Sequence, residues 1–407
     1  MSSHGLTNSV LAKSWDDFHA AQQEVLGWMT ESERFKTVPQ HRAKAYHTMM
    51  EALAMVYNFA VAPRMTHPRL QINTGWQTDF YTLGQNGPDL YYALTFLDGR
   101  QTYRLTGKYN DCVLILGQVI KHLSGHPEST VIGNHDFSSF EIKPDGSFEI
   151  IISATRHEGN WIALDPDSRY QFLLFRRFMN DWNDKKPEMA IERISEIPDD
   201  FYDADEFDEV AMAARIDMAT AYLKYLIRDF NLNLYEWYLG NAKGWNSMTF
   251  LPGTITSTVG SPSSNYAMTM FDLEEDEALI IEMDKVPDGV YWSFQLGDVW
   301  SRSLNYMWRQ TSVSGYHAAV DTDGGFRAVV AHKDPGVKNW LDTTGHVQGS
   351  IVFRNYLATR EPVPVTKKVK FSEIWDHLPS DTEHFTCEQR KAALQSRHDG
   401  VLKLHGE

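Results

Sequence analysis

A histidine and two aspartates in the last quarter of the chain have the types and spacing that acid/base chemistry needs. Residues 326–332 predict a strand, and His332 ends its apolar face because alternate residues of a strand point the same way. Asp334 joins that face if the chain stays extended, and an imidazole beside a carboxylate is a general acid/base pair. We therefore take His332, Asp334 and Asp342 as candidate catalytic residues. The competing interpretation is a turn through Asp334-Pro335-Gly336 with a purely structural role.

The string that contains Asp342 predicts a tight loop. Asn339, Asp342 and the following threonines and glycine favour bonds between side chains and backbone, and Trp340 would anchor such a loop in the core. The functional alternative places Asp342 and His346 against a ligand. Both interpretations stay open from the residues alone.

A metal site is not expected. His332, Asp334 and His346 resemble the two-histidine, one-carboxylate set of non-haem iron proteins, but the last spacing is short for residues gathered from separate strands. The other histidines that could support a site are scattered through a different region, namely His122, His126 and His135. We expect no metal and no cofactor.

Two arginines stand in apolar strand rows. Arg176 and Arg354 each alternate with large apolar residues, and an unpaired guanidinium there costs several kcal/mol. A buried ion pair, with Asp181 or Asp342 as partner, is one explanation. The other is that the arginines bind a substrate carboxylate or sulfate, and Arg309 is a third candidate for holding an anionic or carbonyl oxygen.

An aromatic strand, 291–296, is the last candidate. Gln295 shares a face with Tyr291, and Trp292 points to the opposite side. Such aromatics either pack in the core or line a cavity for a flat apolar ligand. The motifs of nucleotide-binding proteins, phosphate loops, serine hydrolases and zinc proteases are missing from the sequence.

Composition excludes several partners. The chain has 407 residues, with 38 basic and 54 acidic side chains and a formal charge of −16, which disfavours nucleic acid and anionic lipid. The sequence contains no long apolar run and no basic, apolar leader, so we expect a cytoplasmic protein that does not enter the membrane. Its two cysteines make no disulfide framework.

The elements that must position these residues change in period along the chain. Helical spacing dominates the start, and alternation with turn signals takes over from about Leu90, interrupted by one central helix that Asp203 or Asp205 is expected to cap. The clearest predicted hairpin joins Phe140–Ile142 to Phe148–Ile152, and 316–320 predicts a further strand. A terminal helix is expected from near Thr386 with a capping box to Gln389.

The fold class that follows is mainly β with α additions. We expect two antiparallel β-sandwich or jelly-roll-like regions, N-terminal helices, one central helix and one C-terminal helix. The predicted segments are a helical start at 1–65, a first β region at 66–200, a helical and irregular connection at 201–258, a second β region at 259–360, and a tail at 361–407.

Several strings together resemble the uncharacterised DUF1214 family. The most distinctive are Tyr291-Trp292-Ser293-Phe294-Gln295-Leu296 and Asn339-Trp340-Leu341-Asp342, with weaker matches at Gly87-Pro88-Asp89, Asp181-Trp182 and Gly260-Ser261-Pro262. The resemblance covers roughly residues 80 to 360. It implies a two-part β-sandwich architecture and supplies no established catalytic residues.

The functional hypothesis is a cofactor-independent enzyme, a lyase, isomerase or hydrolase, that acts on an apolar ring-containing small molecule by acid/base chemistry. Its substrate-binding candidates are Arg309, Arg354, Gln295, Trp292, Asn339, Trp340, His346 and Arg176. The alternatives are a non-catalytic protein that binds a small molecule or carbohydrate, and an assembly protein. A homo-oligomer is expected because so many aromatic side chains need burial.

Overall fold

The computed structural model divides the chain into two compact units. It describes residues 9–72, 78, 80–197, 207–241, 244–251, 264–360 and 362–406. The first unit comprises Met1–Trp76, Tyr92–Arg177 and Lys186–Leu232, and the second comprises Gln77–Tyr91, Phe178–Lys185 and Asn233–Glu407. Each unit therefore combines segments that are distant in sequence.

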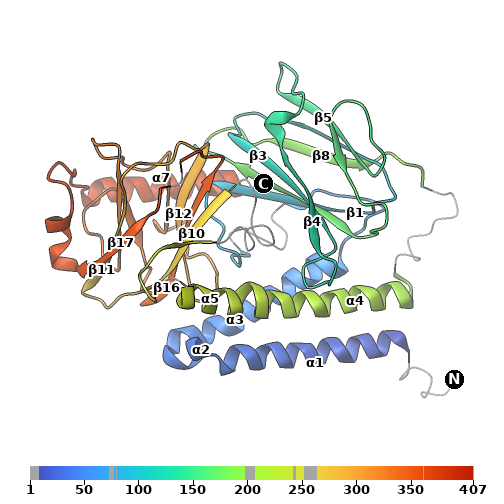
Figure 1. Cartoon of the computed structure of the whole chain (residues 1–407), viewed down its shortest axis with the longest axis horizontal. Helices are drawn as coiled ribbons and strands as arrows, with labels where there is room; N and C mark the ends of the chain where they lie inside the picture. Colours follow the sequence, from blue (N-terminus) through green and yellow to red (C-terminus); the bar gives the residue numbers. More distant parts are fainter. Residues whose placement is uncertain are drawn as a thin grey trace. The chain divides into compact units, whose positions relative to one another are not determined.

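Helices from both ends of the first unit pack together. They are α1 (Val10–Glu31), α2 (Glu33–Thr37), α3 (Pro39–Val56), the π-helical turn η1 (Tyr57–Val61), α4 (Glu209–Lys224) and the π-helical η4 (Tyr225–Asn233). Helix α1 runs along α4 (Figure 1). Asp208 caps α4 by accepting from the Ala211 amide at 2.7 Å; the expected caps Asp203 and Asp205 lie outside the described residues.

Two four-stranded sheets form the β part of the first unit. Their strands are β1 (Leu90–Leu97), β2 (Tyr103–Lys108), β3 (Leu114–Lys121), β4 (Thr130–Asp136), β5 (Ser147–Ser153), β6 (Trp161–Ala163), β7 (Gln171–Phe178) and β8 (Glu188–Arg193). One sheet has the order β1-β7-β3-β4 and the other β6-β5-β2-β8. The ring of Phe137, in the 3₁₀ turn η2 (Phe137–Ser139), touches Phe148 of one sheet and Phe175 of the other. This contact marks the core of a sandwich.

The predicted hairpin before β5 is wrong. The turn exists, because the Lys143 amide donates to Ser147 at 2.9 Å, but residues 140–142 form no strand. Their backbone is bonded elsewhere: the Glu141 amide and carbonyl pair with the Asn160 side chain at 2.8 and 2.9 Å. Strand β5 pairs instead with β2 and β6. The Asn160 side chain thus makes the backbone hydrogen bonds that a neighbouring strand was expected to make.

The second unit holds a second pair of sheets. Its strands are β9 (Thr249–Phe250), β10 (Ser264–Asp272), β11 (Glu277–Met283), β12 (Tyr291–Gly297), β13 (Ser312–Ser314), β14 (Phe326–Ala331), β15 (Trp340–Asp342), β16 (Gln348–Tyr356) and β17 (Val365–Lys370). The orders are β13-β12-β16-β10-β9 and β15-β14-β11-β17. Phe294 of the first sheet stacks on Phe326 of the second with 5.4 Å between ring centroids, inside one apolar core. The sheets therefore face each other as a sandwich.

The fold class predicted from the sequence is confirmed: the chain is mainly antiparallel β with added helices. The strand expected at 316–320 is wrong, because β13 ends at Ser314 and a hydrogen-bonded turn follows it. The second unit also contains α5 (Leu234–Asn241), the 3₁₀ segment η5 (Phe371–His377) and α7 (Cys387–His405). The capping box between Thr386 and Gln389 is present at the start of α7, as predicted.

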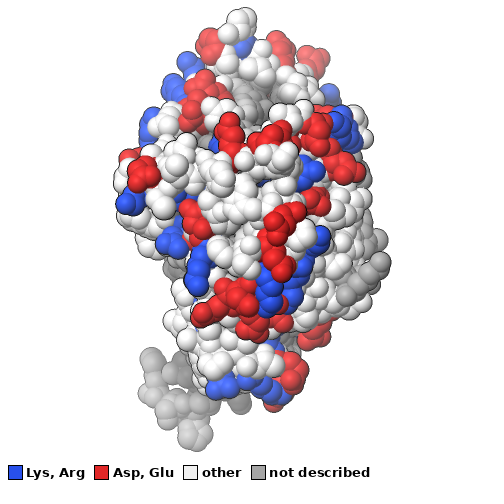
Figure 2. All heavy atoms as spheres, turned by 90° about the vertical axis from the view of Figure 1, so that its left-hand side faces the viewer, with Lys and Arg blue, Asp and Glu red and all other residues white. Residues whose placement is uncertain are grey.

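Charges of both signs are interspersed on the surface shown in Figure 2. The lysines of β17 illustrate this, because Lys368 and Lys370 pair with Glu277 and Asp276 at 2.7 and 2.9 Å. None of the helices in the described ranges has both the length and the apolar composition needed to cross a bilayer. Residues 252–263, which include Gly260-Ser261-Pro262, lie outside the described residues.

Candidate functional site

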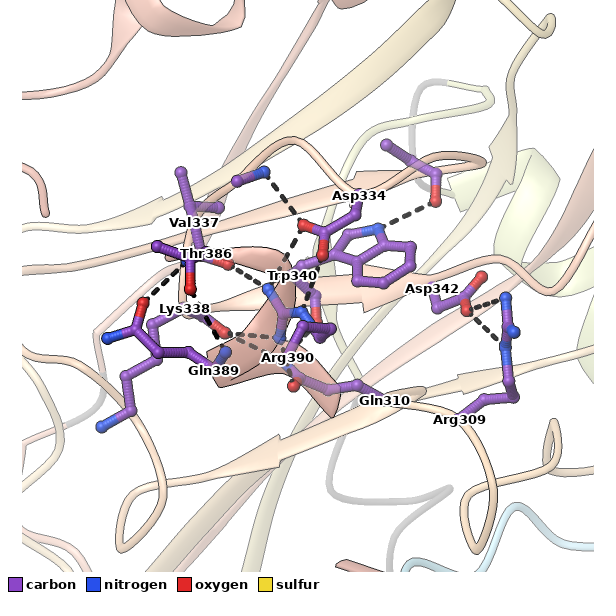
Figure 3. A network of polar contacts seen from close by, with 12 residues as sticks. Arg309, Gln310, Asp334, Val337, Lys338, Trp340, Asp342, Thr386, Gln389 and Arg390 are labelled. Atoms are coloured by element: carbon purple, nitrogen blue, oxygen red, sulfur yellow. Dashed lines mark hydrogen bonds and ion pairs between the residues drawn. The ribbon is translucent and has the colours of Figure 1, made fainter. Parts of the chain in front are cut away.

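Arg390, in the first turn of α7, organises the loop residues that the sequence singled out (Figure 3). Its guanidinium is buried and binds Asp334 (Nε to Oδ2, 2.9 Å) and Gln310 (Nη1 to Oε1, 2.6 Å), and it also donates to the Val337 carbonyl. It lies over the ring of Trp340, 5.1 Å from the centroid. Asp334 thus neutralises a buried cation that fixes the start of α7.

Gln310 connects this network to β15. Its amide nitrogen donates to the carbonyls of Lys338 and Trp340 at 2.8 and 2.7 Å, while its oxygen accepts from Arg390. Every polar atom of the side chain is engaged, so its position is well determined. Neither Gln310 nor Arg390 was among the residues predicted from the sequence.

Asp342 pairs with Arg309, the second ion pair in Figure 3. Arg309 donates to Oδ2 from Nε and Nη2 at 2.7 and 2.6 Å, and Oδ1 accepts from the Thr344 amide at 2.7 Å. The Asp342 side chain is 1% exposed and that of Arg309 is 49% exposed. Burial raises the pKa of Asp342, and the bonds from Thr344 and Arg309 oppose that shift.

His332 has two neutral partners. Nε2 lies 3.0 Å from the Leu273 carbonyl and Nδ1 lies 2.7 Å from the Thr343 hydroxyl. Within the described ranges no carboxylate bonds to this imidazole, so the structure does not bring His332 together with Asp334 or Asp342. The threonine hydroxyl and the carbonyl fix the orientation of the ring between them.

The other candidates from the loop and from β12 are also held by the protein itself. Asn339 bonds the backbone of Ala319 and Arg327, and the indole of Trp340 donates to the Ala331 carbonyl at 3.1 Å. Nδ1 of His346 lies 2.9 Å from the Thr343 carbonyl and closes the loop. These contacts match the structural alternative for each residue.

Trp292 and Gln295 lie on opposite faces of β12. Trp292 packs in the core between the two sheets of its unit. Gln295 is 1% exposed, and its amide nitrogen donates to the Leu296 carbonyl at 2.7 Å. Its Oε1 has no hydrogen-bond partner among the described residues.

The two arginines from apolar rows do not form the expected ion pairs. Arg354 donates to the carbonyl of Gln85, and Arg176 donates to Oε1 of Gln118 at 3.3 and 3.4 Å. The proposed carboxylate partners are engaged elsewhere, Asp342 with Arg309 and Asp181 with Asn183. At each of the two places a neutral oxygen accepts from the guanidinium.

A hollow of about 370 Å³ lies beside this network in the second unit, and we call it the Trp182 pocket. Gln310 and Lys338 belong both to its wall and to the network around Arg390. Its walls are otherwise formed by Asp181, Trp182, Asn183, Ser312, Val313, Tyr316, His317, Phe385, Ala393, Ser396 and Arg397. Aromatic, cationic and hydroxyl groups thus converge on one cavity.

Stacking and hydrogen bonds inside the second unit fix the aromatic wall of the pocket. Trp182 stacks on His317 with 4.1 Å between ring centroids and 18° between planes. Its indole nitrogen donates to Oδ1 of Asp89 at 2.7 Å, and Oδ2 of Asp89 accepts from the Tyr291 hydroxyl at 2.9 Å. Asp89 is 2% exposed, so this chain of bonds fixes the indole from the interior of the unit.

The cationic wall comes from α7. Arg397 follows Arg390 by seven residues, two helical turns, so both arginines lie on the buried face of that helix. Arg397 donates to the Ser312 hydroxyl and carbonyl at 3.1 and 2.8 Å and to the Tyr306 carbonyl at 3.2 Å. Its guanidinium lies 5.0 Å from the centre of the Trp182 ring.

The charge states in the pocket follow from these environments. Burial lowers the pKa of Arg397 to about 10, so the side chain is still a cation at neutral pH. Burial also lowers the pKa of His317, which keeps the imidazole neutral. The Asn183 amide lowers the pKa of Asp181, so that carboxylate is charged. The pocket offers one buried cation beside flat, neutral rings.

Few residues of this pocket could be predicted from the sequence. Trp182 appeared only within a family-like string, and Tyr316, His317 and Arg397 were not singled out. The spacing of Arg390 and Arg397 on a capped helix was a usable signal, because two arginines on one buried helical face need polar partners. Trp182 and Arg397 are too far apart in sequence for any local pattern to connect them.

The architecture defines the class as a protein built from two β-sandwiches. Residues 269–360 match the model of the family described as a protein of unknown function, DUF1214. The resemblance predicted from the sequence is confirmed there; the strings upstream lie outside the match.

Among solved structures, the chain is similar to an uncharacterised protein from Burkholderia cenocepacia. The two are 27% identical with a TM-score of 0.78, and the alignment covers 88% of this chain and 97% of that one. A protein from Vibrio parahaemolyticus aligns with 12% identity and a TM-score of 0.45 over 79% of this chain and 98% of that one. No curated protein matches the chain.

Proposed function

We propose that this chain binds a small molecule with a flat apolar ring and an anionic group, and that the Trp182 pocket is the binding site. The observation that carries the proposal is the buried guanidinium of Arg397 beside the stacked rings of Trp182 and His317. A cavity of about 370 Å³ suits a ligand of one or two fused rings, since small-molecule sites span roughly 300–1,000 Å³.

The N–H groups of Arg397 that make no hydrogen bond to the described residues favour a ligand with an anionic group. Within the described part of the chain its five N–H groups make three hydrogen bonds, all to neutral oxygens. Asp89 influences its charge electrostatically, but both oxygens of that carboxylate are already bonded to Trp182 and Tyr291. A ligand carboxylate, sulfate or phosphate would complete the hydrogen bonding of the guanidinium.

The ring of the ligand follows from the aromatic wall. Trp182 is held in place by Asp89, so the wall that it forms with His317 loses no side-chain freedom on binding. Tyr316, which is 56% exposed, and Phe385 provide further aromatic surface at the pocket. Stacking on such surfaces favours planar ligands over flexible aliphatic ones.

Acid/base catalysis in the same pocket is the second candidate function. The observation in its favour is His317, whose pKa is lowered by burial and whose Nδ1 lies 3.1 Å from the Ser314 hydroxyl. A neutral, oriented imidazole is a general base. Both ring nitrogens of His332 are bonded, to Leu273 and Thr343. We therefore assign the role of general base to His317 in place of His332. Residence in the cytoplasm and self-association remain further predictions.

Calorimetric titration with two matched probes tests the binding proposal. We expect 2-naphthoate to bind wild-type protein and 2-naphthamide, which has the same rings without the charge, to bind at least about tenfold more weakly, because hydrogen bonds to charged groups contribute about 1.5–3 kcal/mol. Tyr316→Ala should weaken the binding of naphthoate. Tyr57→Ala, at a tyrosine of similar exposure (58%) in the first unit, should not. Equal binding of both probes, or none, would contradict the proposal.

Native mass spectrometry after incubation with a metabolite extract separates binding from catalysis. A bound compound of changed mass that disappears with His317→Phe would establish the catalytic version. A compound recovered unchanged from both proteins would establish a binding protein.

A further inference from the structure

The loop after β3 brings two histidines together in the first unit. The rings of His122 and His126 stack with 4.2 Å between centroids and 24° between planes. Oε2 of Glu128 lies 3.4 Å from Nε2 of His122. One ligand atom from each of the three side chains lies within 4.8 Å of the other two. This proximity is not apparent from the sequence, where the histidines are scattered.

The backbone of this loop is fixed. The His122 amide donates to the Tyr170 carbonyl, the His126 amide to the Leu123 carbonyl, and the Ser129 amide to the His126 carbonyl, each at 3.0 Å. His122 has a φ of 57°, a conformation uncommon for a residue other than glycine. Such conformations persist only where the surroundings impose them.

Gly125 holds the loop against α4. Its φ is +93°, and a Cβ at this position would lie 2.5 Å from the Ala221 carbonyl oxygen. Only glycine permits so close a backbone approach. The two imidazoles therefore start from a rigid base, and Nδ1 of the exposed His126 accepts from the Glu128 amide at 3.1 Å.

We propose that His122, His126 and Glu128 form a binding site for a divalent first-row transition metal such as Zn²⁺. Imidazole nitrogens and a carboxylate oxygen are ligands that zinc accepts, and three protein ligands with an open position are a recurrent zinc arrangement. The ion would lie between Nε2 of His122 and Oε2 of Glu128. Small rotations of His126 and Glu128 would bring their ligand atoms to coordination distance.

The amine of Lys121, the adjacent cation, is paired with Asp165 at 2.7 Å. This pairing reduces the repulsion that a bound cation would meet.

Calorimetric titration of the full chain with ZnCl₂ tests the proposal. We expect one saturable site, and we expect His126→Ala and Glu128→Gln each to weaken zinc binding by more than about tenfold, because even changes to groups that only hydrogen-bond a metal ligand cost about 10–100-fold. His19→Ala, an exposed histidine on α1, should leave binding unchanged. MgCl₂ should not compete, since Mg²⁺ prefers oxygen ligands.

Cobalt provides a second readout that does not depend on affinity. Co²⁺ bound to wild-type protein should give visible absorption bands that His126→Ala removes and ZnCl₂ abolishes. A zinc affinity that is unchanged in both His126→Ala and Glu128→Gln, or no saturable binding by the wild type, would overturn the proposal. The site lies in the first unit, so its failure would not affect the proposal for the Trp182 pocket.

Discussion

Trp182 stacks on His317 with 4.1 Å between ring centroids, and the indole is held at its other edge by Asp89. The stack joins the segment Phe178–Lys185 to the turn after β13. It therefore defines a pocket wall from residues that are 135 positions apart (317 − 182).

The titration of His317 should make the free energy of unfolding depend on pH. Because burial lowers its pKa in the folded state, its contribution to stability is complete above the unfolded pKa of about 6.5 and decreases as the pH falls below that value. His317→Phe keeps a ring against Trp182 and removes this titration. We expect the variant to lose less stability than wild type between pH 7 and pH 5 in urea unfolding. A pH dependence equal to that of wild type would contradict the assigned burial.

Gly400 should not tolerate a side chain. A Cβ at this position in α7 would lie 2.8 Å from Cβ of Trp182, and overpacking costs about 1–3 kcal/mol, more than the helix propensity of alanine returns. We expect Gly400→Ala to lower the melting temperature and to weaken naphthoate binding. Gly27→Ala is the matched control, because nothing lies within 4 Å of a Cβ at that position in α1. That control should gain about 0.5–1 kcal/mol.

The charge of Asp334 should matter for stability. Asp334→Asn keeps the shape of the side chain but leaves the buried guanidinium of Arg390 without its carboxylate. We expect a loss of about 2–3 kcal/mol, below the usual value for a fully buried pair because Asp334 is 27% exposed. Asp376→Asn, at an exposed aspartate of η5, should change stability by less than about 0.5 kcal/mol. Similar urea midpoints for the two variants would show that the pair contributes nothing.

Removal of Arg309 should expose the cost of burying Asp342. Arg309→Ala leaves that carboxylate without a cation, and we expect a loss of about 1 kcal/mol at pH 7 because the arginine is half exposed. A carboxyl whose folded pKa is raised stabilises the fold below that pKa and loses this contribution as the pH rises through it. The deficit should therefore shrink at acidic pH. The double variant with Asp342→Asn should recover most of it at pH 7; if it does not, the buried charge is not the cause.

Local patterns predicted the parts of the fold that depend on neighbouring residues. The capping box of Thr386 and Gln389, and the alternation of β12 between Trp292 and Gln295, depend on spacing alone. The hairpin at 140–152 failed because Asn160, a residue outside the hairpin, bonds the backbone of its first arm. Sequence cannot show which distant side chain competes for a backbone group.

The candidate site was harder to predict than the fold for the same reason. Asp334 and His332 looked like an acid/base pair because residues two positions apart share one face of an extended strand. Asp334 instead binds Arg390, 56 residues away, and His332 bonds Thr343 and Leu273. Gly400 of α7 admits the close approach of Trp182, a contact that no local pattern shows. The packing of sheets and helices determines which charged side chains pair, and the local spacing of residues does not show that packing.

A crystal structure of the protein with 4-bromobenzoate would test the central claim most directly. The anomalous signal of bromine locates the ring, and the carboxylate is then placed unambiguously. We predict that the carboxylate binds the guanidinium of Arg397 and that the ring lies against Trp182 and His317. Bromine positions only outside the Trp182 pocket, or an empty pocket at saturating ligand, would contradict the account.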